Sequence, residues 1–466
     1  MFEKIKRRTI ILSDNTIVRD LTQGNPMKQL LKFSVPFILA NLLQQLYNLA
    51  DMVIVGQFVG SAGLAAASSG GEIAIMFLYV AMGFASGGQI VISQHIGAGS
   101  RDRVGKCVGT LFTFIICVAV VFTVLTLSLC DQMLRLVNVP EEAFSYAHDY
   151  SFVYFIGMVP VFGYNVVSAI LRGMGDSKHP FIFVAIAAVL NVILDLLFVG
   201  PLGMECFGAA LATVISQSVS FVIAMIFLYR HRAEFGFEFK LSSFAIDKRE
   251  LKSIAKMGLP LSVMNVAVDL SMLFIARYIN SYGVIAAAAT AVGNKITMVA
   301  TICTAALMTA GNSVIAQNFA AKKYKRISVT MGCILIICLG FAAILSVILI
   351  LFPEQVFALF DHDAEVLKLS HVYAPIGVIT LVGFATRGAG FAFCNGIGNS
   401  RLSFVAGLID GIVARIGFSM LFGIVMDMGV KGFWLGNALA GNVIGIIVLF
   451  YYLFADWKNR KLLVDD

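Results

Sequence analysis

Charged residues are scarce in this chain of 466 residues, and their scarcity decides the solvent in which the chain folds. Only 13% of the residues are charged, whereas 59% are hydrophobic and the mean hydropathy is +0.89. This composition excludes a water-soluble protein and is typical of a surface that faces lipid, so the lipid bilayer is the expected environment. The net charge of +7 coincides with no recognition motif, and no nucleic-acid partner is expected.

Cysteine is equally sparse, and its positions argue against two kinds of site. The eight cysteines are scattered singly in or beside apolar segments, so neither a disulfide framework nor a CxxC metal site is expected. The histidines show no metal-ligand spacing, and no catalytic constellation gathers at one face, so we expect neither an enzyme nor a cofactor. Residues 1–25 lack an uninterrupted apolar core, so no cleavable signal peptide is expected.

Long apolar segments fill most of the chain. Backbone polar groups cannot stay unpaired in hydrocarbon, and segments of about 20 residues or more favour helices over barrel strands. An all-α polytopic membrane protein with twelve transmembrane helices is predicted. The predicted spans are 28–57, 64–94, 107–130, 146–172, 179–200 and 206–230 in the first half, and 251–279, 286–317, 328–352, 369–394, 403–426 and 431–455 in the second.

The two halves of the chain repeat one another. RGMGDSK from Arg172 returns as NGIGNSR from Asn395, and Pro36 corresponds to Pro260. Each half has an even number of spans, so both share one orientation, and we expect two six-helix lobes related by a pseudo-two-fold axis along the membrane normal. A duplicated membrane chain of this kind is typical of transporters.

Basic residues set the expected topology. They concentrate near both termini and in alternate loops, which predicts that both termini are cytoplasmic. A bacterial inner membrane is the expected setting. No oligomer is indicated, so a monomer is expected.

The predicted domains are an N-terminal cytoplasmic segment 1–25, an N-lobe 26–230, a cytoplasmic linker 231–250, a C-lobe 251–455 and a cytoplasmic tail 456–466.

Costly polar residues inside the spans indicate a cation site. Asn191 and Asp195 lie four residues apart on one helix face, and Asp51 and Thr213 come at a similar depth in the outer half of the first lobe. Two carboxylates, an amide and a hydroxyl suit an alkali cation, and two close carboxylates also hold a proton. The alternative is that these groups form separate hydrogen bonds between packed helices.

The motifs QQLYNLADMVIVGQFVG from Gln44, GMGD with GIGN, and NVILD from Asn191 resemble those of the multidrug and toxic compound extrusion (MATE) family, in its DinF-like branch. The resemblance covers nearly the whole chain after residue 25. It implies that Asp51, Asn191, Asp195 and Thr213 form the N-lobe cation or proton site. NorM-type relatives also use two C-lobe carboxylates; Asp269 resembles one of them, but Phe384 stands at the other position and Arg387 lies nearby.

Further residues receive predicted roles. Gln45, Asp269 and Arg387 are assigned to the substrate cavity; Asp269 either anchors cationic substrates or pairs with an arginine, namely Arg277, Arg387 or Arg415. Glu72 and Lys295 occupy equivalent repeat positions, which predicts a gate between the lobes, and Pro36 is the predicted hinge of the first helix.

The predicted function is antiport by alternating access, in which H+ or Na+ drives the export of amphipathic organic cations and drugs. Sodium, if it is the coupling ion, is expected at Asp51 and Asp195. The alternative is a flippase for a lipid-linked oligosaccharide or peptide, which needs a strongly basic cavity. Its candidate residues are Arg277, Lys295, Arg387 and Arg415.

Overall fold

The computed structural model describes residues 16–465. Residues 1–15 of the predicted N-terminal segment and residue 466 of the predicted tail lie outside this range. Within it the ordered elements are helices, and no strand occurs. Eleven helices are long and apolar enough to cross a membrane, and a bent pair provides a twelfth span. The predicted all-helical class and the twelve predicted spans are confirmed.

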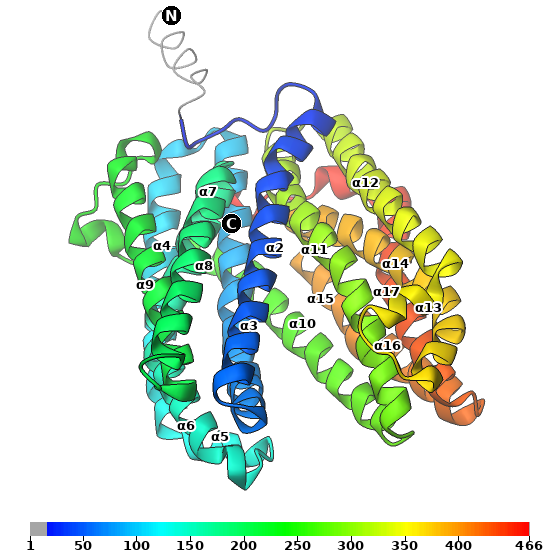
Figure 1. Cartoon of the computed structure of the whole chain (residues 1–466). Helices are drawn as coiled ribbons and strands as arrows, with labels where there is room; N and C mark the ends of the chain where they lie inside the picture. Colours follow the sequence, from blue (N-terminus) through cyan, green and yellow to red (C-terminus); the bar gives the residue numbers. More distant parts are fainter. Residues whose placement is uncertain (1–15, 466) are drawn as a thin grey trace, which may run out of the picture. The chain divides into compact units, whose positions relative to one another are not determined.

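Within the described residues, the first half of the chain contains eight helices (Figure 1). The fourth span is the bent one, because α6 and α7 meet at Gly157 with a bend of 51°. The helices are α2 (Pro26–Phe58), α3 (Ser61–Ala98), α4 (Arg101–Ser128), α5 (Cys130–Leu136), α6 (Glu141–Ile156), α7 (Met158–Met174), α8 (Lys178–Val199) and α9 (Glu205–Arg230).

The second half repeats this order. Its fifth span, Ser400–Val425, alternates α-helix with two π-helical stretches, η4 (Ile409–Ala414) and η5 (Leu421–Val425). The other helices are α10 (Lys248–Asn280), α11 (Val284–Ala320), α12 (Tyr324–Leu351), α13 (Pro353–Ala358), α14 (Ala364–Gly396), α15 (Ser400–Leu408), α16 (Arg415–Met420) and α17 (Gly429–Phe454).

The repeat extends to the turns. The second glycine of GMGD and that of GIGN both have positive φ, 91° at Gly175 and 73° at Gly398. Side chains rarely adopt this backbone conformation, so both loops need glycine there. The short helices α5 and α13 also occupy corresponding places, each between the third and fourth spans. Neither short helix was predicted from the sequence.

The chain forms two compact units, and their boundary falls inside helices. One unit contains Val35–Ser262 with the described residues up to Asp20, and the other contains Leu21–Ser34 with Val263–Asp465. Each unit thus includes the first turns of the helix that continues in the other unit. The boundary between the units lies in α2 beside Pro36 and in α10 beside Pro260. The sequence had predicted this boundary at residues 231–250.

The stretch 231–250 is packed rather than extended. It contains two 3-10 turns, η2 (Arg232–Phe235) and η3 (Leu241–Phe244), and Phe235 and Phe237 are buried. Its backbone approaches α4 so closely that a Cβ at Gly109 would lie 1.9 Å from the Ser243 carbonyl oxygen. Residues 231–250 therefore belong to the packed body of the first unit.

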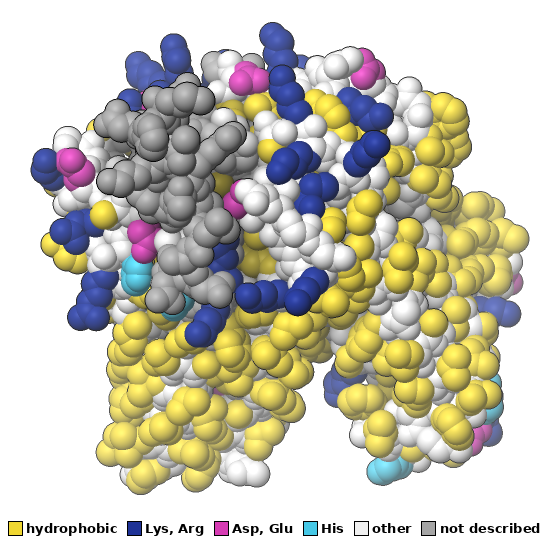
Figure 2. All heavy atoms as spheres, turned by 90° about the horizontal axis from the view of Figure 1, so that it is seen from above, with side chains coloured by type: hydrophobic (Ala, Val, Ile, Leu, Met, Phe, Trp, Pro, Cys, Tyr) yellow, Lys and Arg dark blue, Asp and Glu magenta, His cyan; other side chains and the backbone are white. Residues whose placement is uncertain are grey.

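Basic side chains anchor one end of each unit. In the first unit, Arg103 of α4 donates to Glu250 at the start of α10 over 2.8 Å, and His95 lies 2.9 Å from the same carboxylate. In the second unit Arg326, the repeat counterpart of Arg103, donates to the Gly24 carbonyl over 2.6 Å, just before α2. Figure 2 shows many Lys and Arg side chains on the face that it views.

Glycine allows two helices of the first unit to pack backbone to backbone. A Cβ on Gly87 of α3 would lie 2.8 Å from the Gly258 nitrogen and 2.9 Å from the Ile254 oxygen of α10, whereas Gly71 of α3 faces open space. We expect Gly87→Ala to destabilise the protein by about 1–3 kcal/mol through overpacking. Gly71→Ala is expected to be neutral or to stabilise α3 by up to about 1 kcal/mol.

Thermal unfolding of the two purified variants in detergent compares them directly. A lower midpoint for Gly87→Ala and an unchanged or higher midpoint for Gly71→Ala are expected. Equal midpoints would show that α3 and α10 do not pack as described.

Candidate functional site

Four of the predicted site residues lie together in the first unit. Asn191 and Asp195 stand one turn apart on α8 and are buried, at 1% and 0% exposure. The Asn191 amide Nδ2 donates to the hydroxyl Oγ1 of Thr213 on α9 over 3.3 Å. The Asp51 carboxyl group of α2 lies next to that of Asp195. Three helices thus bring four oxygen-bearing side chains to one place, which we call the N-lobe site.

The N-lobe site has more hydrogen-bond acceptors than donors. Both carboxylate oxygens of Asp195 are buried without a hydrogen-bond partner among the described residues, as are Oδ1 of Asp51 and Oδ1 of Asn191. Two ionised carboxylates have no proton between them, so the Asp51–Asp195 contact is a hydrogen bond only when one of them is protonated. Buried acceptors in this number need a proton or a cation to offset the cost of leaving water.

Neighbouring residues of the N-lobe site were missed by sequence reasoning. Tyr150 of α6 is buried beside both carboxyl groups. Tyr47, one turn before Asp51, lies close to Gln217, which is one turn after Thr213 and has a buried Oε1 without a partner. Tyr47 and Gln217 could have been found from the sequence, because each lies one helical turn from a predicted site residue. They extend the polar faces of α2 and α9 by one turn.

A second buried polar cluster lies in the second unit. Asp410 has no exposed surface, and its Oδ1 accepts from Arg415 Nη2 over 3.0 Å. Its Oδ2 lies 3.4 Å from Arg387 Nη2 of α14. Arg415 also donates to the Asn437 side-chain oxygen on α17 and to the Met272 sulfur on α10 over 3.5 Å. We call Arg387, Asp410 and Arg415 the C-lobe cluster.

The helix geometry around Asp410 is unusual. Asp410 lies in the π-helical stretch η4, and Arg415 follows at the first residue of α16. One wide turn separates the two side chains, so both point into the cluster from a single span. Single π turns inside α-helices occur frequently at functional sites. Arg415 was predicted from the sequence as a possible partner of Asp269, and its pairing with Asp410 was not predicted.

Asp269 forms no ion pair with the C-lobe cluster. It is half-buried on α10, and the part of the chain that the structure describes contains no ion pair to it. Arg387 and Arg415, two of its three predicted partners, pair with Asp410 instead. The third, Arg277, is exposed. Residues 16–465 contain no group of three His, Cys, Asp or Glu side chains suited to a metal ion.

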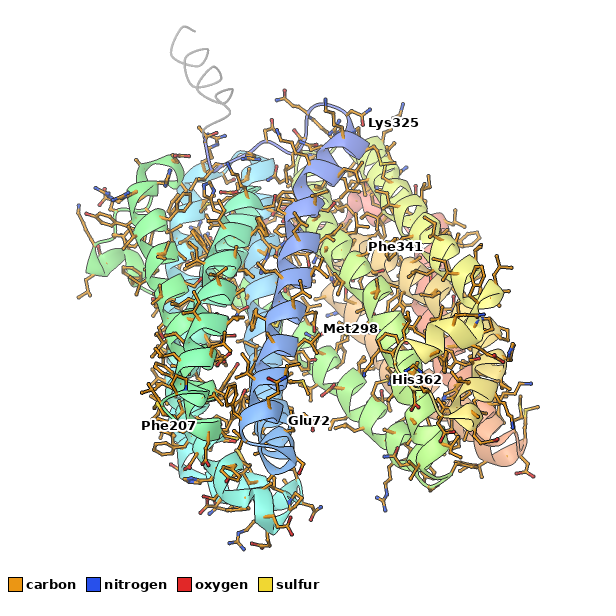
Figure 3. All side chains as sticks on the ribbon, viewed as in Figure 1. Glu72, Phe207, Met298, Lys325, Phe341 and His362 are labelled. Atoms are coloured by element: carbon orange, nitrogen blue, oxygen red, sulfur yellow. The ribbon has the colours of Figure 1, made fainter. Side chains whose placement is uncertain are left out.

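The predicted gate and hinge residues fall in the following places. Glu72 is exposed on α3, and Figure 3 places it toward the same end of its unit as Phe207, near the start of α9. Lys295 is exposed on α11 in the other unit, with its ammonium 5.4 Å from the Phe360 ring centre. Gln45 and Pro36 are half-buried in α2, which continues through the proline.

Known proteins resemble this chain over nearly its whole length. The MatE family model matches residues 36–197 and 260–421, beginning at the repeated prolines. A Bacillus subtilis protein named "Probable multidrug resistance protein YpnP" is 28% identical, covering 96% of this chain and 99% of its own.

Solved structures share the fold. A MOP superfamily transporter from Pyrococcus furiosus, described as having a binding pocket of reverse polarity, is 23% identical with a TM-score of 0.88, over 96% of this chain and 100% of its own. An outward-facing multidrug resistance transporter of the MATE family is 24% identical with a TM-score of 0.85, over 92% and 96%. The predicted membership of the MATE family is confirmed, and the DinF-like branch stays a prediction.

Asp195 and Asp410, two fully buried aspartates, should respond oppositely to the same substitution. Asp195→Asn removes a buried carboxylate that has no partner, so the free energy of unfolding should stay unchanged or rise by about 1–3 kcal/mol. Asp410→Asn leaves two guanidinium groups without their carboxylate and should lower it by about 3–5 kcal/mol. Thermal unfolding in detergent at neutral pH measures both. A loss of stability in Asp195→Asn as large as that in Asp410→Asn would contradict the geometry of the N-lobe site.

Proposed function

The chain belongs to the MatE family of multidrug efflux transporters, and on that premise we propose that it is an antiporter that couples the entry of H+ or Na+ to the export of amphipathic organic cations. It is a multi-pass membrane protein and a transporter rather than an enzyme. The coupling ion, the cationic substrates and alternating access are the parts that we propose.

The N-lobe site is the observation that carries this proposal. Asp51 and Asp195 bring together buried carboxylate oxygens that have no donor in the described chain. A carboxylate at bilayer depth costs at least about 2.5 kcal/mol unless a proton, a cation or water neutralises it. The site therefore favours taking up a cation, and the oxygens of Asn191 and Thr213 supply further ligands for Na+.

Coupling needs the ion to favour one state of the transporter over another. Helix α2 begins in the second unit and continues into the first, where it carries Asp51. The boundary between the two units lies beside Pro36. Proline removes one backbone hydrogen bond and so weakens the helix at this point. We expect α2 to bend near Pro36 when the cation binds, and this bending to link the ion site to movement of the lobes.

The substrate, orientation and assembly complete the proposal. Asp269 and Gln45, both half-buried, are the proposed contacts for organic cations, and Glu72 with Lys295 is the proposed gate. The basic ends of both units support cytoplasmic termini in a bacterial inner membrane. A monomer is proposed, because one chain provides all residues of the N-lobe site.

The flippase alternative has less support. It requires several basic groups in one cavity, but Arg387 and Arg415 share one carboxylate, which offsets half of their charge. The other two candidates, Arg277 and Lys295, are exposed on α10 and α11.

Gradient-driven efflux tests the proposed function. The probe is export of a fluorescent cationic dye from everted vesicles under an imposed proton or sodium gradient. We expect Asp51→Asn and Asp195→Asn each to reduce the coupled rate by at least about tenfold, because a neutral amide cannot replace the charge that recruits the cation. The gradient that drives wild-type export identifies the ion.

Asp149→Asn is the matched control, because Asp149 is an exposed aspartate of the same unit. It should leave export unchanged. Export that persists in Asp195→Asn, at equal protein levels in the membrane, would remove the N-lobe site from the mechanism. Dye movement that needs no gradient in the wild type would contradict antiport.

A further inference from the structure

The proposed ion site does not include the C-lobe cluster, whose Arg387 was assigned from the sequence to the substrate cavity. The charge of this cluster is unbalanced. We infer that Arg387, which is paired with Asp410, binds a carboxylate group of the exported compound. This inference rests on the proposed export function and narrows its substrates to amphiphiles that combine a cationic and an anionic group.

The charge count favours an anionic ligand. Two guanidinium groups surround a single carboxylate, which leaves one net positive charge inside a membrane-spanning unit. A net charge there is costly unless a counterion or water offsets it. The fully buried Asp410 and the nearby Arg415 already form one balanced pair at 3.0 Å. Arg387 is the surplus cation.

Arg387 is also the accessible member of the cluster. Its side chain is 21% exposed, compared with 7% for Arg415 and 0% for Asp410. Its described contacts are one nitrogen at 3.4 Å from Asp410 and the Phe391 ring, 5.7 Å from its guanidinium carbon. An arginine offers five N–H donors in a planar fork, so Arg387 retains donors for two parallel hydrogen bonds to a carboxylate.

The repeat gives this arrangement a counterpart of opposite charge. The N-lobe site draws its residues from the first, fifth and sixth spans of its half. The C-lobe cluster uses the fourth and fifth spans, and its contacts Met272 and Asn437 come from the first and sixth. The same scaffold thus holds an acidic site in one unit and a basic site in the other.

A purely structural ion-pair network makes a different prediction. If Arg387 only stabilised Asp410, removing it would lower stability and weaken all ligands alike. If Arg387 binds substrate, its removal leaves the neutral Asp410–Arg415 pair in place and weakens only ligands that carry a carboxylate.

The test compares two dyes that differ by one methyl ester. Tetramethylrhodamine carries a free carboxylate beside its cationic ring system, and tetramethylrhodamine methyl ester has that carboxylate blocked. Equilibrium binding of each dye to the purified full chain in detergent is measured by fluorescence anisotropy. We expect Arg387→Gln to weaken binding of the free acid by about tenfold or more, the size of one charge-assisted hydrogen bond. Binding of the ester should change by less than about threefold.

Two further variants separate charge from geometry. Arg387→Lys keeps the positive charge but loses the planar arrangement of guanidinium donors, so an intermediate loss of affinity is expected for the free acid. It also keeps the test valid should Arg387→Gln fail to fold. Lys431→Gln removes an exposed cation of the same unit and should affect neither dye.

The inference is overturned if Arg387→Gln weakens both dyes equally, changes neither, or if wild-type protein does not bind the free acid. Failure of the proposed function looks different. In that case the wild type would export neither dye under a gradient, while the selective loss of acid binding in Arg387→Gln would remain.

Discussion

The cost of an unpaired polar group in hydrocarbon governs this structure. Because every backbone donor needs a partner inside the segment, the spans are helices from end to end. Because charges are costly there, basic side chains collect at helix ends, where Arg103 and Arg326 fasten the starts of α10 and α2. The few charges that remain within the spans are therefore informative, and each has either a partner or an unmet need for one.

The two buried aspartates illustrate these two outcomes. Asp410 pairs with one arginine of its own span and with one of α14, so its charge is neutralised inside the packed unit. Asp195 forms no ion pair among the described residues, so its charge must be met by an ion or proton that arrives from outside the protein. The contrast gives the duplicated scaffold two chemically distinct halves, even though its helices, turns and basic anchors repeat closely.

Much of this could be predicted from the sequence, because the signals were local. The lengths of the apolar segments predicted the twelve spans, and the one-turn spacing of Asn191 and Asp195 placed both side chains on one helix face. The pairing of Asp410 with Arg387 was not predictable, because it depends on which faces of two helices meet and on a π turn that composition does not encode. Tyr150 was missed for the same reason, since only the fold brings α6 to the carboxylates. Packing of residues 231–250 was also hidden, because its phenylalanines have no helical period.

Helices α2 and α10 each begin in one unit and continue in the other, which has a consequence for how the chain assembles. Residues 26–230 alone do not make a complete packed body, since the first turns of α10 fill one unit and those of α2 fill the other. This reciprocal exchange is what a domain-swapped homodimer would contain if its two copies were joined end to end. Each half of the sequence therefore needs helical turns from the other half to complete its unit, so neither half is expected to fold as an independent domain.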